Sequence, residues 1–190
     1  MNNQSTRSKV RMIAWTALFI AVTLILGLTP LGIIPIIPGF IDMTIMCIPV
    51  IIGTLTLGLK SGFALGFIFG ICSLITAVTR SVIGPLLLEA SVPKTLIMIF
   101  VPRLLIPVAA YFANKALPFK NSGLKTAIAA VAGSVTNTVL YLGLMRGFFS
   151  DIVGAELFTT AAALNGSIEA VAAALICTPI VSAVRKTMPK

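Results

Sequence analysis

The stretch "AALNGSIEAVAAAL", residues 162–175, places one carboxylate, Glu169, inside a run of alanine, leucine and valine. The run lies in an apolar segment near residues 155–184, which is long enough to cross a hydrocarbon core of about 30 Å as a helix. Nothing nearby in the sequence neutralises the charge. A charge in a bilayer costs about 3 kcal/mol on insertion scales, so it normally faces a bundle interior or a wet cavity. We therefore interpret Glu169 as a candidate functional residue of a membrane-spanning helix.

The composition of the whole chain agrees with a membrane location. Of its 190 residues 58% are hydrophobic and only 10% are charged, and the mean hydropathy is +1.09. We predict an all-α membrane protein with one compact domain, residues 1–190, built from six transmembrane helices. No A-x-A-like cleavage site follows the first segment, so we expect a retained helix and not a signal peptide. The predicted helices span approximately residues 12–28, 41–57, 62–78, 95–117, 126–145 and 155–184.

The basic residues set the predicted orientation. If both termini are cytoplasmic, the inner side carries Arg7, Lys9, Arg11, Lys60, Lys115, Lys120, Lys125, Arg185, Lys186 and Lys190. The outer side then carries only Arg80, Lys94, Arg103 and Arg146. The positive-inside rule selects this orientation, which predicts a multi-pass protein of the cell membrane. The net charge of +9 is therefore a topology signal; no basic face with stacking aromatics suggests nucleic acid as a partner.

With this orientation, the polar residues of the apolar segments gather at one depth in the outer half of the membrane. Asn165 and Glu169 are four residues apart and share one helix face. Convergence of amide and charged groups from several helices predicts a solute-binding cavity. The candidate binding residues are Arg103, Asn137, Asn165, Glu169, Arg80, Tyr141, Thr44 and Asp42. The alternative is an internal ion pair between Glu169 and Arg103 that only satisfies both partners, and the two interpretations can coexist.

Two outer connections favour a covered pocket. Residues 29–40, "TPLGIIPIIPGF", contain three prolines that prevent a continuous helix, yet the segment is apolar enough to lie over a cavity. Residues 79–95 are too long for a tight turn and mix apolar residues with charge. Such connections are often lids or binding loops, although ordinary interfacial packing is the alternative for any single residue.

The chain lacks the usual signatures of catalysis. It has no histidine, and its three cysteines, Cys47, Cys72 and Cys177, lie inside apolar segments, so we expect buried inert thiols and no metal site. There is no G-x-x-x-x-G-K-[ST] phosphate loop, so this chain does not hydrolyse ATP by that route. We expect no cofactor and no enzymatic activity. Uphill transport of a solute would need energy from another subunit.

Several stretches, in their order and spacing over nearly the whole length, resemble the substrate-specific S components of energy-coupling factor (ECF) vitamin transporters. These stretches are "ALFIAVTLIL", "TPLGIIPIIPGFIDMTIMCIPVIIGTLTLGLKSGFALGFIFGICSLI", "PRLL", "GSVTNTVLYLG" and "NGSIEAV". The resemblance implies six helices, cytoplasmic termini and a vitamin pocket near the outer face. It also implies a complex with a transmembrane coupling subunit and two ATPase subunits. Ala17 and Ala21 occupy the A-x-x-x-A position by which such chains contact the coupling subunit.

The same resemblance favours one vitamin. The "PR", "TNT" and "NG..E" groups are similar to the pantothenate and riboflavin carriers, and the opening of the second segment is most similar to pantothenate-type members. A guanidinium from Arg103 or Arg80 suits the carboxylate of pantothenate, while Asn137, Asn165 and Glu169 suit its hydroxyl and amide groups. Riboflavin, folate or pyridoxine are the alternatives. From other classes, a stand-alone carrier or a membrane assembly factor is the rival hypothesis.

Overall fold

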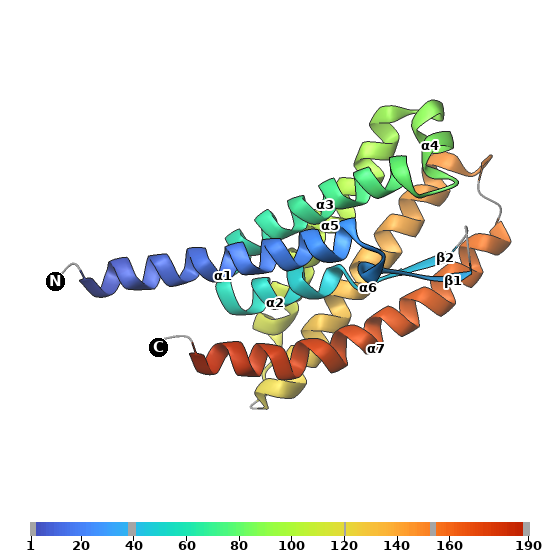
Figure 1. Ribbon diagram of the computed structural model, residues 1–190. Coiled ribbons are helices and arrows are strands. Elements are labelled where there is room, and N and C mark those ends of the chain that lie inside the picture. The colour runs from blue at the N-terminus through green and yellow to red at the C-terminus, as the bar shows by residue number, and fades with distance from the viewer. Residues whose placement is uncertain (1–2, 38–40, 120, 153–154, 188–190) are drawn as a thin grey trace.

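The apolar segments form helices that pack side by side in the computed structural model of the chain (Figure 1). The structure describes residues 3–37, 41–119, 121–152 and 155–187. Within these ranges the side chains of residues 3–5, 7–8, 33–37, 41–43 and 155–165 are not described.

Five helices among the described residues are long and apolar enough to cross a membrane. The elements in chain order are α1 (Asn3–Leu28), η1 (Pro30–Gly32), β1 (Ile33–Ile37), β2 (Ile41–Thr44), α2 (Cys47–Leu57), α3 (Leu59–Thr79), α4 (Gly84–Ala90), α5 (Val92–Ala116), α6 (Ser122–Phe149) and α7 (Ala155–Thr187). Each predicted segment overlaps one of the helices, and the fold is mainly helical as expected. The predicted span of residues 41–57 corresponds to α2, which has only 11 residues and is not among these five helices.

The second helix begins at Cys47 and not at Ile41, because residues 41–44 form strand β2 of a hairpin with β1. The strands are antiparallel, with Ile33 opposite Thr44, and the register shifts between Pro35 and Ile37. Isoleucine favours strands, and Pro35 cannot donate to a ladder, which fits the irregular register. The described part of the proline-containing segment is thus not a continuous helix, as expected, but a short 3-10 helix followed by a strand. The second long connection likewise contains a short helix, α4.

The two ends of the bundle differ. The beginning of α1 and the end of α7 lie at the same end, whereas the hairpin and α4 lie at the other (Figure 1). We refer to these as the terminal end and the hairpin end. The polar residues predicted to converge can therefore be placed relative to the hairpin.

Helix α2 is the centre of the core. Its residues from Cys47 through Leu55 are all buried, including Val50 and Ile51, and it contacts α1, α3, α5, α6 and α7. A helix that is apolar on every side suits such a central position.

Glycines on α3 allow α5 to approach closely. A Cβ at Gly66 would lie 2.6 Å from the carbonyl oxygen of Arg103, and one at Gly62 would lie 2.7 Å from Cβ of Pro107. Pro107 has no N–H, so it leaves that Arg103 carbonyl without its usual helical donor. The two glycines thus let α3 pack closely against α5 beside Arg103.

Candidate binding site

Arg103 on α5 is buried, with 6% of its surface exposed. Its guanidinium carbon lies 4.3 Å from the ring centroid of Tyr141 on α6 and 5.3 Å from that of Phe69 on α3. A cation over an aromatic face gains more when it is desolvated, as it is here. Two of the bundle's helices thus supply rings that hold a positive charge inside an apolar domain.

The hydrogen bonding of this guanidinium is incomplete. Pro102 has no N–H, so the carbonyl of Met98 loses its helical donor, and Arg103 Nη1 lies 3.5 Å from that oxygen, at the limit of a hydrogen bond. Arg103 Nε is buried and has no hydrogen-bond partner. Among the described side chains Arg103 forms no ion pair. The predicted cation therefore has capacity left for an anionic group.

Glu169 on α7 is held by threonines. Its Oε1 accepts from the backbone N–H of Thr44 at 2.8 Å and from the Thr44 hydroxyl at 3.1 Å. Its Oε2 accepts from the Thr138 hydroxyl at 2.9 Å. The described partners of this carboxylate thus come from β2 and α6 and do not include Arg103, so the ion-pair alternative is not the contact that the structure shows.

Asn137 directly precedes Thr138 on α6. It is buried, and its Oδ1 has no hydrogen-bond partner. Ser134 is fully buried, and its Oγ is unpaired as well. Residues 134, 137, 138 and 141 follow the spacing of one helix face. An unpaired buried oxygen costs about 1–3 kcal/mol, so two of them on one face suggest a polar partner that completes them.

Ser134 and Phe69 were not among the residues predicted from the sequence. Ser134 stands three residues before Asn137, and this helical spacing is a signal that could have identified it. Phe69 had no such signal, because a phenylalanine in an apolar helix is ordinarily a core residue.

Of the other predicted residues, Tyr141 contacts Arg103 and Thr44 contacts Glu169, which leaves Arg80, Asp42 and Asn165. Arg80 is exposed, and its Nη2 donates to the carbonyl of Leu28 at the end of α1. Asp42 stands opposite Pro35 in the hairpin, and Asn165 stands one turn before Glu169 on α7, but the side chains of both lie outside the described residues.

The alanines predicted to contact a partner lie on α1. Ala17 and Ala21 are both exposed, and α1 is the least buried of the five long apolar helices. The described part of the fold therefore leaves this face open.

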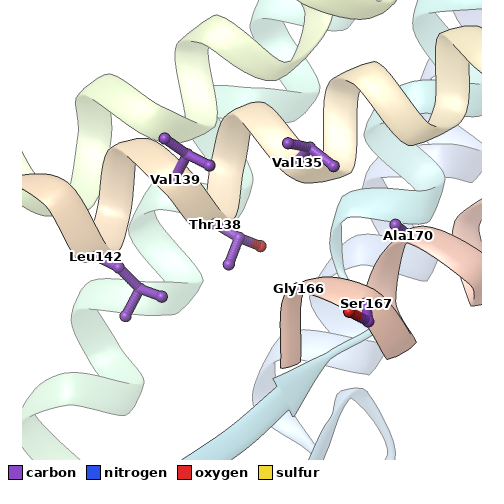
Figure 2. A pocket seen from close by; sticks show the side chains of 7 residues that line it. All are labelled: Val135, Thr138, Val139, Leu142, Gly166, Ser167 and Ala170. Carbon is purple, nitrogen blue, oxygen red and sulfur yellow. The ribbon is translucent and has the colours of Figure 1, made fainter. Parts of the chain in front are cut away.

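A groove of about 390 Å³ lies between α6 and α7 (Figure 2). It is lined by Val135, Thr138, Val139, Leu142, Gly166, Ser167 and Ala170. Val135 and Val139 are exposed, so the groove opens on the side of the bundle. Figure 2 shows the Thr138 hydroxyl directed toward α7, where it meets Glu169. The walls are mainly apolar, and none of the unpaired polar groups lines it.

Comparison with known proteins gives two matches. The profile of the family described as "ECF transporter, substrate-specific component" matches residues 11–184. The chain is also similar to the pantothenic acid transporter PanT of Lactococcus lactis subsp. cremoris (strain MG1363), with 31% identity over 195 aligned positions. That alignment covers 95% of this chain and 96% of the relative.

Proposed function

The chain belongs to the family of ECF transporter substrate-specific components, and on that basis we propose that it captures pantothenate at the outer face of the cell membrane. The observation that carries the choice of substrate is the buried Arg103 guanidinium, whose Nε is unpaired. Pantothenate has a carboxylate, an amide and two hydroxyls in a flexible chain. A carboxylate at Arg103 would supply the charge that this guanidinium lacks. The similarity to a pantothenic acid transporter supports the same substrate.

The remaining groups of pantothenate need amides and hydroxyls, and α6 offers these. Asn137 and Ser134 each have a buried unpaired oxygen that can accept from a hydroxyl or amide of the solute. Asn165, one turn before Glu169, is the second amide that we propose for this role. Phe69 and Tyr141 face the guanidinium, so they are already occupied and do not form an open slot for a flavin ring.

We further propose that the hairpin end faces outward and the terminal end faces the cytoplasm. In this orientation α2 and the hairpin together complete a sixth crossing beside the five long helices. The Lys and Arg residues of the termini, and of the connections at the terminal end, support this orientation by the positive-inside rule. The binding groups then lie in the outer half of the bilayer.

Partner subunits would provide the energy. We propose a transmembrane coupling subunit that contacts α1 at Ala17 and Ala21, together with two ATPase subunits. Both alanines are exposed, and small residues let a partner helix approach closely. Replacing both with Leu should abolish pantothenate uptake by cells and leave binding by the purified chain unchanged. Ala183→Leu on the exposed side of α7 is the matched control, and unchanged uptake in the double variant would reject this docking face.

The substrate is tested by calorimetry on the purified chain in nanodiscs, with pantothenate, riboflavin, folate and pyridoxine. We expect tight binding of pantothenate and no heat with the others. Binding of riboflavin alone would overturn the assignment of pantothenate as the substrate. Absence of binding with every vitamin would favour the assembly-factor hypothesis. Uptake by the isolated chain in vesicles without ATPase subunits would instead support a stand-alone carrier.

A further inference from the structure

Glu169 joins three elements of the fold through one buried carboxylate. It is on α7, its Oε1 accepts two hydrogen bonds from Thr44 at the end of β2, and its Oε2 accepts one from Thr138 on α6. Only 6% of the residue is exposed. A buried carboxylate with three donors is a strong local restraint, because hydrogen bonds to a charged acceptor are about twice as strong as neutral ones.

The restraint acts at the base of the hairpin. Thr44 stands opposite Ile33, at the open end of the ladder and directly before α2. A two-stranded hairpin is marginally stable by itself, so its position depends on contacts to other elements. At Thr44 one of these contacts is a backbone N–H donated to Glu169, which no substitution of the Thr44 side chain removes.

We propose that Glu169 is a positioning residue that fixes the hairpin and thereby sets the rate at which the solute leaves. It does so through Thr44 and Thr138, without contacting the solute. The proposal rests on the proposed function for its kinetic part and on the hydrogen bonds alone for its structural part. It differs from the prediction that Glu169 itself binds hydroxyl or amide groups of the vitamin.

The structural part is tested without any vitamin by hydrogen exchange of the chain in nanodiscs. In Glu169→Gln the negative charge is lost, so the bonds from Thr44 lose their charge assistance, and an amide nitrogen facing Thr138 would donate to a hydroxyl that now donates to Oε2. We expect roughly tenfold faster exchange of the amides of β2 and the start of α2. Thr138→Val, which is nearly isosteric, should give a smaller change in the same direction, and Thr138→Ser should restore slow exchange.

Thr178→Val is the matched control, because Thr178 on the same helix as Glu169 donates only to the carbonyl of Ala174. It should leave exchange in β2 unchanged. If Glu169→Gln fails to fold, Thr138→Val carries the test alone. Unchanged exchange at the hairpin base in the folded variants would overturn the proposal.

The kinetic part is tested by stopped-flow binding of pantothenate. We expect Glu169→Gln to raise the dissociation rate constant roughly tenfold and to change the association rate constant by less than about twofold. If Glu169→Gln weakens pantothenate binding while hydrogen exchange at the hairpin base stays as in the unsubstituted chain, the proposal is overturned in favour of direct contact between Glu169 and pantothenate. Faster exchange with unchanged dissociation would overturn the kinetic part. Faster exchange in a chain that binds no vitamin would support the structural part and reject the proposed function.

Discussion

Two arginines of the bundle, Arg185 near the end of α7 and Arg103 in the middle of α5, show what distinguishes a binding group from a structural one. At the terminal end, Arg185 Nη2 donates to the carbonyl of Leu55 at 3.0 Å, and Nη1 donates to the Ser122 hydroxyl at 3.3 Å. The Leu55 carbonyl lies in the last turn of α2, where helical donors run out. Arg185 therefore donates to a backbone carbonyl that lacks a donor within its own helix.

At Arg103 the relation is reversed. Arg103 is more deeply buried, but its Nε has no partner, and its contacts are two aromatic rings and one long bond to Met98. The fold supplies hydrogen-bond acceptors to the guanidinium of Arg185, but it leaves Nε of Arg103 without one. Burial of a charge alone is thus a weaker sign of function than the donors that remain unused.

The largest expected effect is on Arg103. Arg103→Gln removes the charge that we assign to the carboxylate of pantothenate, and we expect about 100-fold weaker binding by calorimetry. Arg185→Gln should leave the affinity within about twofold of the unsubstituted value while lowering the apparent Tm. Equal loss of affinity in both variants would contradict the distinction between the two arginines.

A second substitution tests the unpaired oxygens of α6. Asn137→Ala should weaken pantothenate binding about tenfold, because it removes a hydrogen bond that only the solute completes. Thr126→Val, also buried on α6, is the control, since the Thr126 hydroxyl already donates to the carbonyl of Ser122. Tight binding by Asn137→Ala would exclude this amide from the site.

A third test concerns the orientation of the guanidinium. Pro102→Ala gives the Met98 carbonyl a helical N–H, which competes with Arg103 Nη1, and we expect about fivefold weaker binding. Pro107→Ala restores a donor to the backbone carbonyl of Arg103 instead, so its effect on affinity should be smaller. The reverse order would show that the proline before Arg103 does not orient its side chain.

The smallest effect is expected at Arg80, which the sequence suggested as an alternative clamp for the carboxylate. Its guanidinium is exposed and donates to the Leu28 carbonyl, so it resembles Arg185 more than Arg103. Arg80→Gln should change pantothenate affinity by less than about twofold in the same calorimetric assay. A loss comparable to that of Arg103→Gln would move the site toward the end of α1.

Hydropathy predicted the long helices well, because a span of apolar residues has one stable form in lipid. It could not predict the hairpin, since the isoleucines of residues 33–37 and 41 suit a buried helix as well as a strand. For the site, depth along a helix brought Arg103 and Tyr141 into one layer. The contacts between side chains, such as Thr138 with Glu169, depend on helix rotation, which one sequence does not specify.

The short α2 has a consequence for how a charged solute reaches the centre of the bundle. Eleven residues rise about 16 Å, roughly half of a hydrocarbon core, and the two-stranded hairpin supplies the rest of the crossing that we propose. The free edges of a hairpin have unpaired N–H and C=O groups that lipid tails cannot satisfy, so at least one edge must face protein or water. In the orientation that we propose, with the hairpin end outward, water would extend along the hairpin into the bilayer. A carboxylate following that path would keep its water until it meets Arg103, without crossing bare hydrocarbon.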